Sequence, residues 1–211
     1  RVSKERFRSH TIIVNCQLST AISPVQLKSM TVNSELVSQH LAEGDRLQQS
    51  GNFDEAIAQY QKSLAIEADN AIVLNKIAKV YYAQQKFTDA IVSCHQALRN
   101  QPKFAPVYKT LGNVLQAQGK IDAAIRAYAK AIEFNPNFVE AYVNLGSMFY
   151  KQGRLDDAII HYQKAIALQP DLAAAYWNLG KILEQQGQIN EGVFYYQKKA
   201  LNLQPELEAF Q

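Results

Sequence analysis

Apolar side chains recur along residues 37–206 at spacings of three and four residues, which place them on one face of an α-helix. Two such faces follow one another, separated by a turn that usually contains glycine, and the second face ends near a proline. The pattern therefore predicts helical hairpins rather than strands. The hairpin unit is 34 residues long and occurs five times without a gap, at 37–70, 71–104, 105–138, 139–172 and 173–206.

Particular positions of the unit explain why two helices form and pack. Large residues at positions 4, 7 and 11 share one face of the first helix, and a small residue at position 8 lets the second helix approach. We expect the small residue at position 20 to face position 8. Glycine near position 15 suits a left-handed helix cap, and proline at position 32 cannot continue a helix. Position 8 holds Gly44, Ala78, Gly112, Gly146 and Gly180, position 20 holds Ala56, Ala90, Ala124, Ala158 and Gly192, and position 24 holds Tyr60, Cys94, Tyr128, Tyr162 and Tyr196.

This unit resembles the tetratricopeptide repeat, because eight positions agree with that motif in three or more copies. The resemblance implies an all-α fold, a right-handed α-solenoid in which first helices line a groove and second helices form the outer wall. The first copy departs from the motif at His40 and Glu43, on a face that no earlier repeat covers. The fifth copy has one extra residue in the run 197–200, so we expect a bulge or a shifted register there.

Positions 2, 5, 6, 9, 12 and 13 of the first helices are expected to face the groove. They are rich in asparagine, mildly basic and interrupted by aromatic residues. Amides both donate to and accept from a peptide backbone, lysines attract carboxylates, and aromatic rings supply anchor area. The candidate residues for binding a peptide or partner are Asn75, Lys76, Lys79, Tyr82, Lys109, Asn113, Asn144, Ser147, Tyr150, Trp177, Asn178 and Lys181.

Two groups of these residues resemble binding devices of the family. Lys109, Asn113 and Asn144 match part of the clamp with which chaperone adaptors hold a terminal carboxylate, but Ala174 and Asn178 stand where that clamp has cations. Asn144 and Asn178 also resemble an asparagine ladder that holds extended peptide backbone in some family members. The ladder is absent from the first three copies.

Residues 1–36 share nothing with the repeat and are expected to form an irregular or partly ordered leading segment. Met30 stands just before the array like a natural start codon, so residues 1–29 have three interpretations. They are vector-derived or an upstream extension, an arginine-rich targeting arm, or an ordered strap across the first repeat. A short tail, 207–211, is expected after the array.

The net charge of +3 is concentrated at one end of the chain. Residues 1–29 hold five basic side chains and one acidic side chain, so the rest of the chain has a net charge of −1. Such a balanced body does not favour a nucleic-acid partner. No apolar run reaches the length of about 18 residues that a membrane-spanning helix needs, so membrane insertion is not expected.

No group of residues has the spacing of a catalytic or metal centre. The chain has two cysteines, which make no disulfide framework, and Cys94 takes a core position where a buried, inert thiol is expected. We therefore expect no catalytic residue, no cofactor and no metal. The cysteine usage favours a reducing compartment and hence a cytoplasmic location.

Taken together, these features favour a protein–protein interaction scaffold, rather than an enzyme, that binds a peptide or partner segment in its concave groove. Two alternatives remain open. The array is the substrate-docking region of a larger enzyme, such as a glycosyltransferase or methyltransferase, or it is a structural protein that self-associates through an uncapped carboxyl-terminal face.

Overall fold

The computed structural model describes residues 24–187 and 191–205. These residues form ten α-helices and no strand, which confirms the all-α prediction. Expectations for residues 1–23, including Cys16, and for residues 206–211 lie outside the described part. The helices are α1 (Pro24–Gln49), α2 (Phe53–Ile66), α3 (Ala71–Ala83), α4 (Phe87–Asn100), α5 (Ala105–Ala117), α6 (Ile121–Phe134), α7 (Val139–Lys151), α8 (Leu155–Leu168), α9 (Ala173–Gln185) and α10 (Glu191–Leu203).

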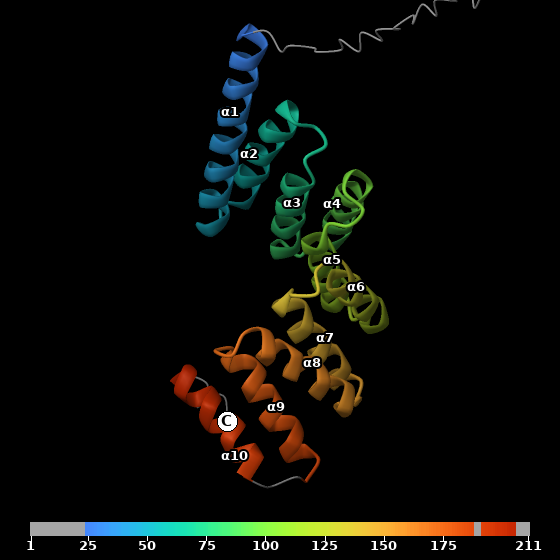
Figure 1. Ribbon diagram of the computed structural model, residues 1–211. Helices are drawn as coiled ribbons and strands as arrows, with labels where there is room; N and C mark the ends of the chain where they lie inside the picture. The colour runs from blue at the N-terminus through green and yellow to red at the C-terminus, as the bar shows by residue number, and fades with distance from the viewer. Residues whose placement is uncertain (1–23, 188–190, 206–211) are drawn as a thin grey trace, which may run out of the picture.

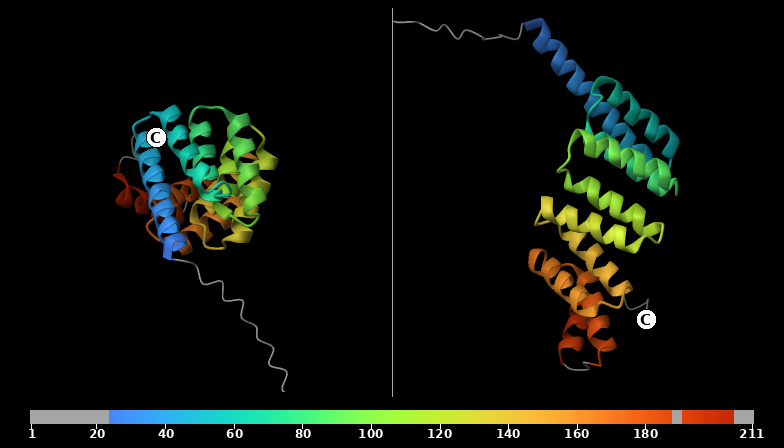
Figure 2. Two further views of the ribbon diagram at one scale, coloured as in Figure 1. Left: turned by 90° about the horizontal axis from the view of Figure 1, so that it is seen from above. Right: turned by 90° about the vertical axis from the view of Figure 1, so that its right-hand side faces the viewer.

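Successive helices pair as hairpins, from α1 with α2 to α9 with α10, and each hairpin packs on the next. Figure 1 follows this stack from the blue end to the red end, and the right-hand view of Figure 2 shows the hairpins as layers of an elongated solenoid. Buried apolar side chains join neighbouring layers, as in other helical repeats. Helix α1 begins at Pro24 and passes Val37 without a break, so no bend marks the expected boundary of the leading segment.

The turn inside each hairpin is set by one left-handed residue, as position 15 predicts. Gly51 has a φ of 79°, and the N–H of the following Asn52 donates to the carbonyl of Leu47 at 2.9 Å. This bond satisfies a carbonyl that the end of a helix would otherwise leave free. In the second repeat Gln85 takes the same place with a φ of 57°, a conformation that costs an L side chain energy.

Close approach within a hairpin depends on a pair of positions that the sequence analysis did not name, positions 8 and 24. A Cβ atom on Gly44 would lie 2.5 Å from the ring of Tyr60, and a Cβ atom on Gly112 would lie 2.5 Å from the ring of Tyr128. Position 8 therefore lies against the aromatic ring of position 24. The second repeat is consistent with this geometry, because Ala78 has a Cβ atom and its partner is the smaller Cys94.

The extra residue of the fifth repeat shifts the register of α10 without a bulge in that helix. A Cβ atom on Gly180 would lie 3.0 Å from Cγ of Gln197 and 3.6 Å from Cβ of Tyr196, so Gln197 takes the place that the tyrosine ring has in earlier repeats, and its Nε2 donates to Glu184 at 3.2 Å. Ala200 is fully buried, as is the position 27 residue of each earlier repeat. The additional residue therefore lies before Gln197. As a result Gln197, one residue after Tyr196, takes the structural place that position 24 has in the earlier repeats.

Candidate peptide-binding groove

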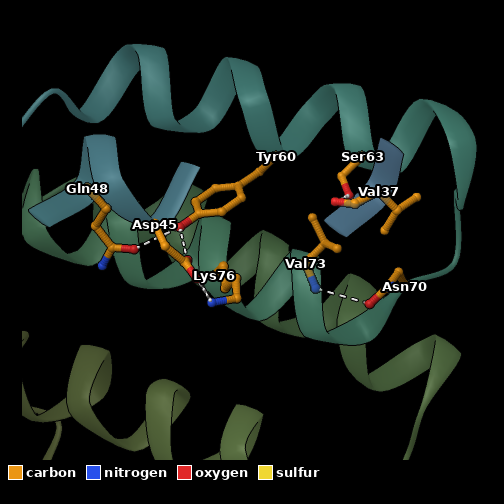
Figure 3. A network of polar contacts seen from close by, with 8 residues as sticks. All are labelled: Val37, Asp45, Gln48, Tyr60, Ser63, Asn70, Val73 and Lys76. Atoms are coloured by element: carbon orange, nitrogen blue, oxygen red, sulfur yellow. Dashed lines mark hydrogen bonds and ion pairs between the residues drawn. The ribbon is translucent and has the colours of Figure 1, made fainter. Parts of the chain in front are cut away.

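A chain of polar contacts connects the outer helix of the first repeat to the groove. The Tyr60 hydroxyl crosses the hairpin from α2 and donates to Oδ1 of Asp45 at 2.7 Å, with Oε1 of Gln48 3.1 Å away. Lys76, from the next repeat, donates to the same carboxylate at 2.7 Å and 2.9 Å. Figure 3 shows Tyr60 and Lys76 converging on Asp45, with Gln48 bonded to the Tyr60 hydroxyl. Positions 24, 9 and 6 therefore form a relay that also joins neighbouring repeats.

The third repeat contains a neutral version of this relay. The Tyr128 hydroxyl donates to Oδ1 of Asn113 at 2.8 Å, and Nδ2 of Asn144 donates to the same oxygen at 3.0 Å. Because two donors occupy that oxygen, Asn113 has only its amide N–H groups to offer a ligand. Beside Asn144, a hollow of about 240 Å³ opens between the apolar side chains of Val143 and Leu172.

Electrostatics fix the protonation of the first relay. Burial alone would raise the pKa of Asp45, but hydrogen bonds from Lys76 and Tyr60, together with the charge of Lys76, lower it below its usual value. Burial and the adjacent Asp45 raise the pKa of Tyr60. The carboxylate is thus ionised and the phenol neutral at pH 7, so the positive charge of Lys76 is balanced by the Asp45 carboxylate in the wall of the groove.

Lys79 and Lys109 differ from Lys76 because neither has an ion pair within the described part of the chain. Desolvation lowers the pKa of Lys79, and the nearby charges of Lys109 and Lys76 lower it further, whereas Asp45 and Glu140 partly oppose the shift. The ammonium groups of Lys76 and Lys109 therefore both act on that of Lys79. Their mutual repulsion is relieved when an anion lies between them.

Two candidate residues were wrongly expected to be exposed. Asn75 is 4% exposed and Trp177 is 7% exposed, whereas Lys109 and Val143 at the same position 5 of the third and fourth repeats are only half-buried. The burial of Asn75 leaves its Oδ1 without a hydrogen-bond partner. In contrast, Tyr82 and Tyr150, at position 12, are 37% and 41% exposed, so their rings are available to a ligand.

The remaining candidates are held in different ways. Lys109 lies 5.6 Å from the centre of the Phe138 ring, and Lys181 lies over Trp177 at 5.1 Å. Ser147 is hydrogen-bonded to Tyr162, whose pKa burial raises to about 12. Asn178 is half-buried. Asn144 is bonded to Asn113, and within the described residues no hydrogen bond joins it to Asn178.

Sequence reasoning missed Asp45 and the tyrosine hydroxyls as parts of the groove. Asp45 occupies position 9, which was expected to face inward, but the candidate residues included none from the first copy. Tyr60 and Tyr128 were assigned to the core by their rings. The sequence held a signal for them, because the hydroxyl of a tyrosine whose ring is buried needs a polar partner.

Other chemistry in the described residues is limited. They contain no cluster of three or more histidine, cysteine or acidic side chains placed to hold a metal ion. Cys94 is free and fully buried, as expected, and burial raises the pKa of its thiol to about 12. No helix within the described ranges has both the length and the apolar character needed to cross a bilayer.

The stacked hairpins and their polar-walled groove define a helical-repeat protein of the solenoid class. Scans against protein families match the TPR repeat at residues 44–85, 112–153 and 146–187, and the tetratricopeptide repeat at residues 173–207. The chain therefore belongs to the tetratricopeptide repeat family. Membership supports a protein-interaction scaffold as its general class. A search of curated proteins finds no significant match.

Solved structures share the fold. A crystal structure of MamA is 32% identical and superposes with a TM-score of 0.66, covering 80% of this chain and 97% of that one. YrrB, described as a TPR protein with an unusual peptide-binding site, is 23% identical with a TM-score of 0.60, over 85% of this chain and 92% of that one. PilF of Pseudomonas aeruginosa is 18% identical with a TM-score of 0.71, over 81% of this chain and 76% of that one. The last two likenesses concern the fold alone.

Proposed function

We propose that the groove binds an extended, acidic peptide segment of a partner protein. The observation that carries the proposal is the trio Lys76, Lys79 and Lys109, in which only Lys76 has an acidic partner within the described residues. The amide N–H groups of Asn113 lie on the same wall, which therefore offers mainly hydrogen-bond donors. A carboxylate accepts several such bonds and relieves the repulsion between the cations.

The remaining groove residues suit the rest of such a segment. Tyr82 and Tyr150 are exposed aromatic rings that can pack on apolar side chains of the peptide. The hollow between Val143 and Leu172 offers one apolar seat next to Asn144. YrrB has a peptide-binding site on the same fold, so a peptide is a ligand of suitable size for such a groove. The role is binding, without a catalytic step.

Fluorescence anisotropy with a labelled eight-residue peptide of glutamate and glycine tests the proposal. Replacing Lys79→Gln together with Lys109→Gln is expected to weaken binding at least fivefold and to reduce its dependence on salt. The matched control, Lys62→Gln with Lys164→Gln, removes the same charge from exposed sites on α2 and α8 and is expected to change the affinity less than twofold. Equal losses of affinity in the two double variants would indicate a non-specific charge effect and would reject the groove as the binding site.

A second variant tests the amides. Asn144→Ala with Asn178→Ala is expected to weaken the same peptide without unfolding the array, because both side chains lie at position 6 and are half-buried. An unchanged isotherm would remove these two residues from the site, while the lysine result would still decide the role of the cations.

Self-association is a second candidate, which one exposed residue favours. In the shifted register of α10, Phe194 takes the place of Ile57, which is 8% exposed because the next repeat covers it. Phe194 is 67% exposed. Light scattering against protein concentration tests whether another copy covers this face. A molecular mass that rises with protein concentration, and returns to the monomer value in Phe194→Ser, would support self-association. A constant monomer mass would exclude self-association.

A further inference from the structure

A pocket of about 440 Å³ lies outside the groove, where the first two repeats meet. It opens between the carboxyl-terminal ends of α2 and α4, with Leu74 of α3 contributing part of its apolar wall. The apolar lining comes from Leu64 and Leu74, and the polar lining comes from Asp69, Gln96, Arg99 and Asn100.

The equivalent place one repeat later is filled by the protein itself. Tyr108 and Phe134 pack there with ring centres 5.3 Å apart, and the Tyr108 hydroxyl donates to the carbonyl of Pro102 at 3.0 Å. Lys130 lies 5.6 Å from the centre of the Phe134 ring and forms a 2.7 Å ion pair with Glu133. In the third repeat the two rings therefore pack on each other, and the charge of Lys130 is paired with that of Glu133.

Each of these residues is replaced at the pocket, 34 positions earlier. Leu74 stands in place of Tyr108 and Asn100 in place of Phe134, so both rings are absent and their space is open. Arg99 stands in place of Glu133, which leaves an exposed guanidinium with no hydrogen bond or ion pair in the described residues. Compared with the next repeat, the pocket therefore lacks both aromatic rings, and Arg99 lacks the ion pair that Glu133 forms there, although the carboxylate of Asp69 is part of the lining.

We propose that this pocket binds an aromatic side chain of a partner protein, with a carboxylate of the same segment held by Arg99. The ring would take the space that Tyr108 and Phe134 fill in the next repeat and would pack on Leu64 and Leu74. A guanidinium binds a carboxylate through two parallel hydrogen bonds, which fixes the orientation of the segment. Asp69, on the opposite rim, accepts a backbone N–H. An aromatic anchor paired with arginine is the usual composition of a binding hot spot.

Titration of isotopically labelled protein with the blocked peptide Gly-Glu-Tyr-Glu-Gly, followed by NMR, tests the site. The amide resonances of Leu64, Leu74 and Arg99 are expected to move with a single dissociation constant. A peptide with alanine for tyrosine, and another with glutamine for both glutamates, are each expected to bind at least fivefold more weakly. If only the amide resonances of Lys79 and Lys109 move, the peptide binds in the groove. That result would overturn the proposed pocket site while supporting the proposed groove site.

Filling the pocket from within gives the sharpest variant. Leu74→Tyr with Asn100→Phe installs the ring pair of the next repeat and is expected to abolish the shifts at Leu64 and Arg99. Circular dichroism checks that this variant folds. Arg99→Gln, at an exposed position, is expected to weaken binding at least fivefold regardless of that result, whereas Arg126→Gln on α6 is the matched control. Undiminished binding in Arg99→Gln, or equal weakening in both glutamine variants, would overturn the proposal.

Discussion

Gln152, which follows α7, donates a 2.7 Å hydrogen bond from Nε2 to Oδ1 of Asp122 in the first turn of α6. The bond runs from position 14 of one repeat to position 18 of the repeat before it. The same link joins Gln84 to Asp54 at 2.8 Å and Gln186 to Asp156 at 3.1 Å. The series is interrupted between the second and third repeats, where Gln118 has Thr88 in the place of the aspartate, and no hydrogen bond joins these two described residues.

Restoring this link should stabilise the stack. Thr88→Asp places a carboxylate within reach of Gln118 and in the first turn of α4, where negative charge also favours the helix dipole. We expect a gain of about 1 kcal/mol in the free energy of unfolding, measured by urea titration. The reverse change, Asp122→Thr, should lose a similar amount. A gain from Thr88→Asp that persists when Gln118 is changed to alanine would assign the effect to the dipole alone.

The left-handed cap of α3 offers a second gain. Gln85 has a φ of 57°, while the same position in the other repeats is glycine. Gln85→Gly relieves backbone strain but makes the unfolded chain more flexible, so the expected net gain is roughly 0.5–1 kcal/mol. Gly119→Gln, the matched change in the next repeat, should destabilise the protein. Thermal melting of both variants decides the matter, and a loss in Gln85→Gly would show that the glutamine side chain contributes a contact.

The fit between positions 8 and 24 predicts a strong coupling between two substitutions. Gly112→Ala alone forces a Cβ atom against the Tyr128 ring and should destabilise the protein by about 1–3 kcal/mol. Tyr128→Cys alone leaves a cavity and should destabilise it by about 3–5 kcal/mol. Together they recreate the Ala78 and Cys94 pair of the second repeat, so the double variant should lose less than the sum by about 1 kcal/mol or more.

Urea unfolding of the four proteins in this cycle measures the coupling directly. Additive losses would show that the ring of Tyr128 moves away from position 8 freely and that the glycine is not required by the packing.

His161 makes stability depend on pH. Burial lowers its pKa, and Arg154 acts in the same direction while Asp157 opposes it; the ring also stacks on Phe149 at 5.2 Å and lies 6.0 Å from Tyr142. Because the folded pKa lies below the unfolded value of about 6.5, the unfolded state binds more protons as pH falls. Stability should therefore decrease as pH falls through 6.5 toward the folded pKa, and it should be fully present above that range.

Replacing the imidazole removes this dependence. His161→Gln should flatten the profile of unfolding free energy between pH 7 and pH 5.5, whereas His95→Gln, at an exposed site, should leave it unchanged. An identical profile in wild type and His161→Gln would show that the ring is solvated when it is protonated.

The sequence predicted the fold because the same small, apolar and helix-ending residues recur in phase, and each repeat needs only its neighbour to cover its apolar flank. It did not predict which small residue faces which helix. Spacing along one helix says that Gly44 and Ala56 are both buried, but the contact of Gly44 with Tyr60 depends on how the two helices are rotated about their axes.

The groove was predicted less completely for a similar reason. Asn75 and Trp177 were expected to be exposed but are buried, although Lys109 at the same position of the third repeat is half-buried, so exposure at one position differs from repeat to repeat. The relay through Tyr60 and Asp45 joins helices of two repeats, and a pattern read along one helix cannot place residues across such a junction. The pocket beside Arg99 was missed because it is defined by side chains that are too small rather than by a motif.

The polar links between neighbouring repeats are expected to affect where the stack deforms. Inner and outer polar links both join the first repeat to the second and the third to the fourth, whereas the described residues at the junction of the second and third repeats have neither. There α3 and α5 contact each other directly, and side chains of both belong to one apolar cluster. Deformation of the superhelix on binding a ligand is thus expected to concentrate at this junction, which carries Lys79 and Lys109, so the width of the groove is expected to change together with the spacing of these two lysines.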